Sequence, residues 1–124
     1  MTTLDDVRRL ALALPDTQED AEGYSFSVQV KGKQKGFAWV WREKSDPKKP
    51  RIPRQDVLAV RVDSELQKQM LIAADPVKFF TEPHYNGYPA VLVRLREIDA
   101  EELHELLAEG WQCLQPPPPR HKAR

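Results

Sequence analysis

The chain has 124 residues, 40% of them hydrophobic and 31% charged, and no apolar run approaches the ~20 residues that a membrane-spanning helix needs. Its nineteen Lys and Arg are balanced by nineteen Asp and Glu, which excludes the whole-molecule positive field of a strong nonspecific nucleic-acid binder. One cysteine, Cys113, cannot form an internal disulfide, and the acidic start is unlike a secretion signal, so we expect a soluble, cytoplasmic protein.

The first part of the chain predicts a helix and two strands. Thr3 can cap a helix over residues 3–14, in which apolar side chains recur at helical spacing. Residues 24–30 alternate between apolar and polar side chains, which predicts a strand with one buried face. The glycines of residues 31–36 then favour a reversal into a second strand over residues 37–42.

The middle of the chain predicts a loop, a strand and a helix. Residues 43–56 contain prolines among basic side chains, and because proline lacks the donor of a sheet ladder, we expect a loop here. Residues 57–62 alternate as a third strand. A helix capped by Asp63 or Ser64 follows. It carries its apolar residues on one side, namely Leu66, Met70, Ala73 and Ala74.

Two turns precede the last strand. Asp75 and Pro76 predict a short helical turn, with the aspartate as its cap and the proline in its first position. Asn86 and Gly87 favour a tight turn because both tolerate positive φ. The strand over residues 90–95 comes next, after a proline that favours an extended backbone.

The closing segment predicts a capped helix and a tail. Asp99 and Glu102 form a capping pair for a helix that ends at the final run of prolines. We expect residues 1–115 to form a single domain and the Pro-rich, basic residues 116–124 to be a frayed tail. Helices that flank consecutive strands indicate an α+β fold, an antiparallel β-sheet with the N- and C-terminal helices packed on one face.

The two faces of this sheet should differ in character. We place these side chains towards the helices: Phe26, Val28, Leu58, Val60, Val62, Val91 and Val93. The other face then carries Ser25, Ser27, Gln29, Arg61 and Arg94, and also Arg42 if Trp39 and Trp41 point inward. We therefore expect an open face that is polar and basic.

Four blocks of the chain carry a family resemblance. They are Ala13-Leu14-Pro15 at the end of the opening helix, the hairpin from Val30 to Lys33, the strand from Leu58 to Asp63, and the segment from Phe79 to Arg94 with Pro83-His84-Tyr85 at its centre. In this order they resemble the MmcQ/YjbR-like family of small bacterial proteins, over nearly the whole chain from Leu4 to Leu114.

The resemblance implies a fold similar to that of frataxin-like proteins, described as a double-wing arrangement, and a proposed DNA-binding role. It implies no agreed catalytic residue. Many relatives carry a Pro-x-Tyr-His segment followed by a His-Trp pair, whereas this chain has His84 before Tyr85 and Pro89-Ala90 in the corresponding place. The candidate residues therefore come from the local sequence.

Basic side chains crowd the predicted loop and recur on the predicted strands. The candidates for binding nucleic acid are Arg42, Lys44, Lys48, Lys49, Arg51, Arg54, Arg61 and Arg94. Such side chains contact phosphates and position a protein on DNA without reading its sequence. The structural alternative is a solvated loop, with strand arginines that pair with acids.

His84, Tyr85 and Tyr88 form a candidate ligand pocket, because histidine titrates near neutrality and tyrosine offers both a stacking surface and a hydroxyl. The alternative is that they pin a turn against the sheet. Trp39 and Trp41 are expected in the core, but an outward register would instead favour single-strand binding.

No arrangement of residues in the sequence demands catalysis. The three histidines lack metal-site spacing, so we expect neither a metal nor a cofactor. Cys113 is expected to be a buried, inert thiol on the last helix. The leading hypothesis is a non-enzymatic DNA-binding protein. The alternatives are a protein-interaction module or small homo-oligomer, and a small-ligand-binding protein.

Overall fold

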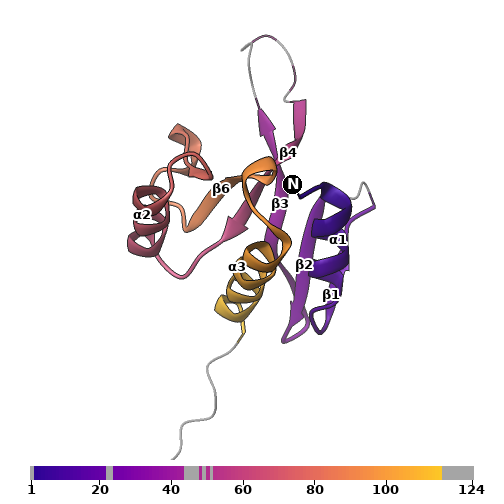
Figure 1. Ribbon diagram of the computed structural model, residues 1–124. Coiled ribbons are helices and arrows are strands. Elements are labelled where there is room, and N and C mark those ends of the chain that lie inside the picture. Colours follow the sequence, from indigo (N-terminus) through magenta and orange to yellow (C-terminus); the bar gives the residue numbers. More distant parts are fainter. Residues whose placement is uncertain (1, 22–23, 44–47, 49, 51, 116–124) are drawn as a thin grey trace, which may run out of the picture.

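The structure is a computed structural model that describes residues 2–21, 24–43, 48, 50 and 52–115 (Figure 1). In chain order its elements are α1 (Leu4–Leu12), β1 (Thr17–Glu19), β2 (Ser25–Val30), β3 (Lys33–Glu43), β4 (Ile52–Arg61), α2 (Glu65–Ala74), β5 (Phe79–Phe80), η1 (Pro83–Tyr85), β6 (Ala90–Arg94), η2 (Leu95–Glu97) and α3 (Ala100–Cys113). The short strands β1 and β5 were not predicted from the sequence.

The strands form one antiparallel sheet in the order β1-β2-β3-β4-β6-β5. Helices α1 and α3 pack together over one face of it, and α2 lies beside β6 and β5 (Figure 1). This arrangement confirms the predicted α+β class, with the N- and C-terminal helices on one face. Within the described ranges, no helix is both long and apolar enough to cross a membrane.

The helix starts predicted from capping residues are confirmed. The Thr3 hydroxyl accepts a hydrogen bond from the backbone amide of Asp6, and the Asp6 carboxylate accepts one from the backbone amide of Thr3. This second bond is the main reason that the pKa of Asp6 is lowered. At the start of α3, the Asp99 side chain accepts from the Glu102 amide at 2.8 Å. Each bond satisfies an amide that has no partner within its helix.

The hydrophobic core lies between the sheet and the two helices α1 and α3. The strand residues predicted to face the helices all belong to it: Phe26, Val28, Leu58, Val60, Val62, Val91 and Val93. The helices contribute Val7, Ala11, Leu103, Leu106 and Leu107. Helix α3 also comes close to β4 at Gly110, where an added Cβ would lie 2.8 Å from the carbonyl oxygen of Arg61.

A β-bulge in β3 changes which side chains point inward. Phe26 pairs with Ala38 whereas Ser27 pairs with Gly36, so two residues of β3, Phe37 and Ala38, lie opposite one residue of β2. Both are fully buried in the core. Because the extra residue shifts the alternation by one position, the tryptophans further along β3 point to the other face. The expectation that they point inward is wrong.

The predicted loop over residues 43–56 is partly strand. β3 continues to Glu43 and β4 begins at Ile52, and the two pair antiparallel at Arg42 with Pro53 and at Trp41 with Arg54. Proline is tolerated here because it lies near the end of a two-stranded arm, where a missing donor breaks no central ladder. The loop prediction is therefore wrong for residues 52–56. Residues 44–47, 49 and 51 lie outside the described part of the chain.

Helix α2 turns its predicted apolar side to solvent. Leu66 is 69% exposed and Met70 is 63% exposed, and both alanines of the stripe are exposed as well. The side that packs inward instead carries Lys68, which is fully buried, with Leu71 and Ile72 partly buried against the core. The aliphatic stem of Lys68 supplies the apolar surface there, while its ammonium group reaches polar partners.

Two tight turns follow the sequence closely. Lys31 and Gly32, at the tip of the β2–β3 hairpin, both have positive φ, 51° and 81°. Gly87 has φ 78° after Asn86 with φ −64°, and the Tyr88 amide donates to the Tyr85 carbonyl at 3.0 Å. This is a type II turn, which confirms the predicted turn at Asn86 and Gly87. The turn predicted at Asp75 is also present, without a helix.

One ion pair beside the core gives a pH-dependent prediction. The Lys78 ammonium donates to Glu102 on α3 and lies 3.6 Å from a carboxylate oxygen of Asp75. The hydrogen bond to Glu102 is the main reason that the pKa of Lys78 is raised. A raised folded-state pKa contributes stability that is fully present below the unfolded-state value of about 10.4 and is lost as pH rises through the folded-state value.

We expect Lys78→Met to lower the free energy of unfolding at pH 7 by about 0.5–1 kcal/mol, since Lys78 is mostly buried but Glu102 is partly exposed. Urea denaturation from pH 8 to pH 11.5 checks this. The difference between the two proteins should shrink above about pH 10.4, because only the native chain gains from the charged lysine. A difference that stays constant across that range would contradict this role for the ion pair.

Candidate nucleic-acid interface

The outer face is the face of the sheet turned away from α1 and α3, and its centre is aromatic. Val57, Ala59 and Leu92 are buried there, and the side chains packed against them are Trp39, Trp41, Phe80 and Tyr85. The rings meet edge to face, with centroids 5.8 Å apart for Trp41 and Phe80 and 6.3 Å apart for Trp39 and Tyr88. The outer face thus differs from the purely polar and basic surface predicted from the sequence.

The segment from Pro83 to Tyr88 is attached to the outer face by two anchors. The indole Nε1 of Trp39 donates to the Tyr85 hydroxyl at 2.9 Å. From the opposite side, the buried ammonium of Lys68 donates to the carbonyl oxygens of Tyr85 and Tyr88, the latter at 3.1 Å. A charged donor on two carbonyls holds the turn firmly. The position of Tyr85 over the sheet therefore depends on a lysine of α2.

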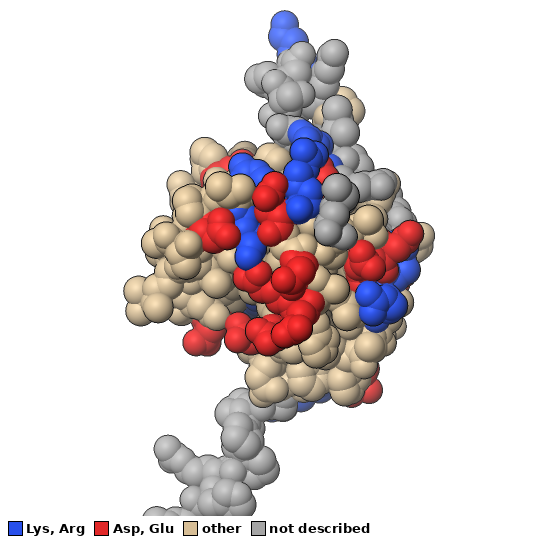
Figure 2. Space-filling model, in the orientation of Figure 1, with Lys and Arg blue, Asp and Glu red and all other residues tan. Residues whose placement is uncertain are grey.

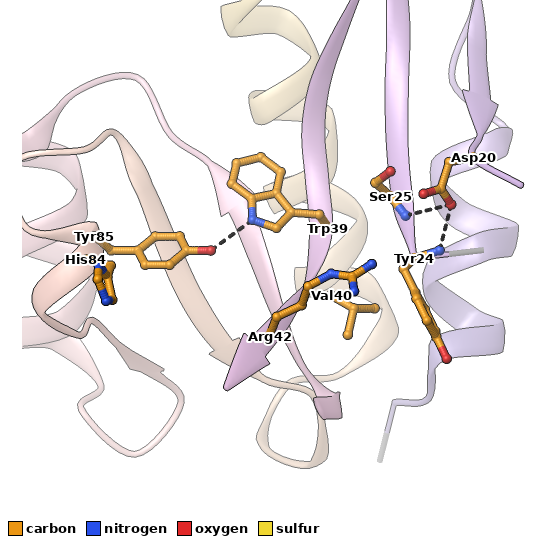
Figure 3. A pocket seen from close by; sticks show the side chains of 8 residues that line it. All are labelled: Asp20, Tyr24, Ser25, Trp39, Val40, Arg42, His84 and Tyr85. Atoms are coloured by element: carbon orange, nitrogen blue, oxygen red, sulfur yellow. Dashed lines mark hydrogen bonds between the residues drawn. The ribbon is translucent and has the colours of Figure 1, made fainter. Parts of the chain in front are cut away.

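The first hollow on the outer face has a volume of about 330 Å³ and three aromatic walls, Tyr24, Trp39 and Tyr85. Arg42 lies between them, with its guanidinium carbon 5.6 Å from the centre of the Tyr24 ring, a distance typical of a cation–π contact (Figure 3). The Asp20 carboxylate accepts from the backbone amide of Tyr24 at 2.8 Å. Asp20 thereby fixes the strand edge that carries the Tyr24 wall.

The second hollow, of about 500 Å³, lies beside Trp41, whereas the first lies beside Trp39. Trp41 and Phe80 form its aromatic wall. The guanidinium carbon of Arg94 is 4.1 Å from the centre of the Phe80 ring, and the same group donates to the carbonyl oxygen of Val77 at 2.9 Å. Arg94 is therefore held against the Phe80 ring.

Two further arginines in the second hollow share one carboxylate. One oxygen of Asp56 lies 3.5 Å from Nε of Arg54, and the other lies 3.4 Å from a terminal nitrogen of Arg96. All three side chains are partly or largely exposed, so the attraction between them is weakened by solvent. One carboxylate between two guanidinium groups leaves this part of the hollow positive.

A third hollow, of about 640 Å³, lies where β3 and β4 approach the end of α3. Lys35 and Arg61 line it beside Trp39 and Tyr88. Among the described residues that line this hollow there is no carboxylate. This hollow, which opens at the end of the sheet beside Leu114 at the end of α3, therefore has the largest positive excess per lining residue of the three.

The three hollows together carry an excess of positive charge. The basic lining residues are Lys35, Arg42, Arg54, Arg61, Arg94 and Arg96, and the acidic ones are Asp20, Asp56 and Glu97. Six cations against three anions give a formal excess of three positive charges among these described residues. Because the whole chain has a formal net charge of zero, negative charge must exceed positive charge elsewhere.

Much of that negative charge lies on the helical side. Figure 2 shows acidic side chains gathered in the region of α3, on the side of the molecule covered by helices. Helix α3 presents three exposed glutamates and one partly exposed one, namely Glu101, Glu105, Glu109 and Glu102. The charges of this neutral chain are thus divided between its two sides, which gives a polyanion a preferred side of approach.

The candidate residues from the sequence are distributed over these hollows. Arg42 lies in the first hollow, Arg54 and Arg94 lie in the second, and Arg61 lies in the third. Lys48 is within the described part of the chain. Lys44, Lys49 and Arg51 lie outside it. Each of the four strand arginines therefore lines one of the three hollows, at separate positions.

The candidate pocket of His84, Tyr85 and Tyr88 is divided between two hollows. His84 and Tyr85 line the first hollow, whereas Tyr88 lines the third. The two tyrosine rings meet edge to face with centroids 6.2 Å apart. The same residues also serve the structural purpose considered as the alternative, because Tyr85 ties the turn to Trp39.

Sequence reasoning missed several residues of the site, among them Tyr24, Lys35, Lys68 and Arg96. Lys68 had a readable signal, because it precedes Leu71 and Ile72 by three and four positions and therefore shares their side of the helix. Tyr24 was predicted only as the first residue of a strand, and no contact of its ring was predicted. Arg96 lies in η2, where no periodic pattern indicates which way a side chain points.

Neither metal chemistry nor thiol chemistry is supported by the described residues. No three His, Cys, Asp or Glu side chains in the described part of the chain lie close enough together to hold a metal ion. Cys113 is exposed, so the expectation of a buried thiol is wrong. Although the residue is exposed, neighbouring protein atoms remove part of the water around its sulfur, and this desolvation is the main reason that the pKa of the thiol is raised. The nearby Asp63 carboxylate raises it further, so the thiol stays protonated and weakly reactive near neutral pH.

The structure is a small α+β domain whose outer face carries aromatic and basic side chains. The YjbR family model matches residues 12–113, so the chain belongs to the YjbR family. Protein DR2400 of Deinococcus radiodurans, which carries the DUF419 domain, has a similar crystal structure. The TM-score is 0.64 at 27% sequence identity, over 90% of this chain and 77% of that one.

Mycobacterial relatives are similar over almost the whole length of the chain. The uncharacterized protein Mb2600 of Mycobacterium bovis is 39% identical over 127 aligned positions, which cover 94% of this chain and 91% of the relative. The uncharacterized proteins MT2646 and Rv2570 of Mycobacterium tuberculosis match with the same identity and coverage.

Proposed function

We propose that this chain is a DNA-binding protein whose contact surface is the outer face of the sheet. The observation that carries the proposal is that six Lys and Arg side chains line the three hollows against only three carboxylates. Phosphates are attracted to such a surface, and the glutamates of α3 repel them from the opposite side. The charge distribution therefore supports binding to one side of a neutral molecule.

The basic segment between β3 and β4 extends the proposed surface along the chain. The sequence predicts that Lys44, Lys48, Lys49 and Arg51 contact phosphates, and these residues follow directly after Arg42 and Glu43 of β3. Contacts of this kind fix a protein on nucleic acid without selecting a base sequence. We therefore expect binding that depends strongly on salt and weakly on sequence.

A salt series with a fluorescent duplex of DNA tests the proposal. On duplex DNA the logarithm of the binding constant should fall linearly with the logarithm of salt concentration, with a slope of about −0.9 for each phosphate contact. The triple variant Arg42→Gln, Arg54→Gln and Arg61→Gln should bind at least tenfold more weakly in low salt. Its slope should also be shallower, because up to three contacts are removed.

A matched control comes from the helical side. Arg8 and Arg9 of α1 are partly or largely exposed, and each pairs with a carboxylate on the same helix, Asp5 and Asp6 respectively. The double variant Arg8→Gln and Arg9→Gln should keep nearly all of the affinity.

A second variant, with Lys48, Lys49, Arg51 and Arg54 all changed to Ala, reports on the basic segment. Equal losses in the control and outer-face variants, or a slope near zero for the unmodified chain, would contradict the proposal.

A further inference from the structure

We infer that the preferred partner of the outer face is single-stranded nucleic acid, with unpaired bases stacked on its aromatic side chains. This inference rests on the proposed function and names the form of nucleic acid that the same surface recognises. It depends on the register of β3, because the bulge at Phe37 and Ala38 is what brings Trp39 and Trp41 to this face.

Aromatic rings and arginines alternate along the outer face. Trp39 and Trp41 are two positions apart on β3, which places their Cα atoms about 6.6 Å apart along the strand. Each tryptophan lines a hollow of its own, and each hollow contains an arginine held against a second aromatic ring, Arg42 on Tyr24 and Arg94 on Phe80. Proteins that bind single strands combine a positive groove with aromatic surfaces in this way.

Apart from the two-stranded arm of β3 and β4, the hollows of the outer face are better suited to a single strand than to a duplex. A protein that reads a duplex inserts a protruding helix or β-ribbon into a groove. The arginines of the outer face instead lie in hollows between aromatic rings. The bases of an intact duplex are stacked on one another and cannot enter such hollows, whereas an unpaired base can turn outward and stack on an aromatic ring.

The lining residues also indicate tolerance of sequence. Asn and Gln are the side chains that pair with adenine edges, and none is present among the described residues that line the three hollows. The Asp20 carboxylate, which could accept from a cytosine amino group, is already bonded to backbone amides of β2 and the residue before it. Stacking is a contribution that every base can provide, and the lining arginines are the side chains that can add contacts to guanine edges.

The test compares oligo(dT) with a DNA duplex of the same length by fluorescence anisotropy at one low salt concentration. We expect the single strand to bind at least tenfold more tightly. Trp39→Leu keeps an apolar side chain against Ala59 but removes the stacking surface, so it should weaken single-strand binding about 5- to 150-fold and change duplex binding less than twofold. Trp39→Phe should restore most of the lost affinity.

Two controls make the result decisive. Trp111 lies on α3, where its indole donates to the Pro15 carbonyl, so Trp111→Phe should leave both affinities unchanged. Tyr24→Leu removes a different aromatic ring from the same hollow. It replaces Trp39→Leu in the test if the Trp39→Leu protein melts at a much lower temperature than the unmodified chain. A parallel titration with oligo(U) identifies the kind of strand. Tighter binding of oligo(dT) supports both the inference and the proposed function, whereas tighter binding of oligo(U) supports the inference but replaces DNA by RNA as the partner.

The outcomes separate the inference from the proposed function. Equal or tighter binding of the duplex, or a parallel loss of both affinities in Trp39→Leu, would overturn the inference and leave the DNA-binding proposal in place. No binding of either form at low salt would overturn both. Tighter single-strand binding that is lost in Trp39→Leu and retained in Trp111→Phe would support both.

Discussion

Replacing Lys68 with Met is expected to lower the free energy of unfolding by about 2 kcal/mol, although the side-chain volume barely changes. The ammonium group of Lys68 is fully buried, donates to the carbonyl oxygens of Tyr85 and Tyr88, and lies 3.7 Å from a carboxylate oxygen of Glu65. A hydrogen bond from a charged group contributes about 1.5–3 kcal/mol. Each carbonyl keeps one backbone partner, the amides of Tyr88 and Ala90, which limits the loss.

Urea denaturation of the variant measures this effect, and Lys33→Met is a suitable control because Lys33 is exposed near the β2–β3 turn. The control should change stability by less than about 0.5 kcal/mol. A double-mutant cycle with Tyr85→Phe adds a second test. If Lys68 holds Tyr85 in reach of Trp39, loss of the hydroxyl should cost less once Lys68 is gone. Additive losses, or a Lys68→Met variant as stable as the unmodified chain, would contradict this role.

Gly110→Ala is expected to destabilise the protein by about 1–3 kcal/mol, the reverse of what helix propensity predicts. Within a helix, alanine is normally more favourable than glycine by about 1 kcal/mol. Here the new Cβ would lie 2.8 Å from the carbonyl oxygen of Arg61, which belongs to the backbone of β4 and cannot rotate away. The helix must therefore move off the sheet, and the packing of Leu106 and Leu107 is disturbed.

A thermal melt of Gly110→Ala checks the sign, with Gly36→Ala as the comparison. Gly36 lies in β3, where an added Cβ meets only the Trp39 ring at the ordinary contact distance of 3.9 Å. We expect this second variant to be neutral or slightly stabilised, because alanine lowers the entropy of the unfolded chain. An increase in melting temperature for Gly110→Ala would show that α3 is not in close contact with β4.

The sequence predicts the elements of this fold well where local chemistry determines them. Thr3 with Asp6 and Asp99 with Glu102 mark helix starts, and Asn86 with Gly87 marks a type II turn. These signals need only a few neighbouring residues and their backbone preferences. The inward side of β2, β4 and β6 was also predicted correctly, since strict alternation with one apolar face permits only one register.

The sequence does not predict features that depend on partners distant in the chain. The extra residue of the bulge, Phe37, becomes visible only when β2 is paired with β3, and it reverses the orientation of Trp39 and Trp41. Burial of Lys68 depends on carbonyls that lie 17 and 20 positions later. Prolines at residues 47, 50 and 53 suggested a loop, whereas Pro53 lies in β4 and pairs with Arg42 of β3.

For the candidate site, the sequence indicated the kinds of residue more reliably than their arrangement. Arg42, Arg54, Arg61 and Arg94 all line the hollows, and alternation along β4 and β6 places Arg61 and Arg94 on the side of Ala59 and Leu92. Their separation into hollows and their contacts with aromatic rings depend on the bulge and on the turn that carries Tyr85. The aromatic part of the interface therefore emerges only from the folded chain.

The shortness of the two outermost strands restricts how partners can join this molecule. β1 spans three residues and β5 only two, so neither side of the sheet offers a long row of unpaired amides and carbonyls. The Thr17 hydroxyl further ties β1 to the end of α1 by donating to the carbonyl of Leu14 at 2.8 Å. Lateral addition of a peptide strand, or sheet-to-sheet growth into fibres, is thus disfavoured.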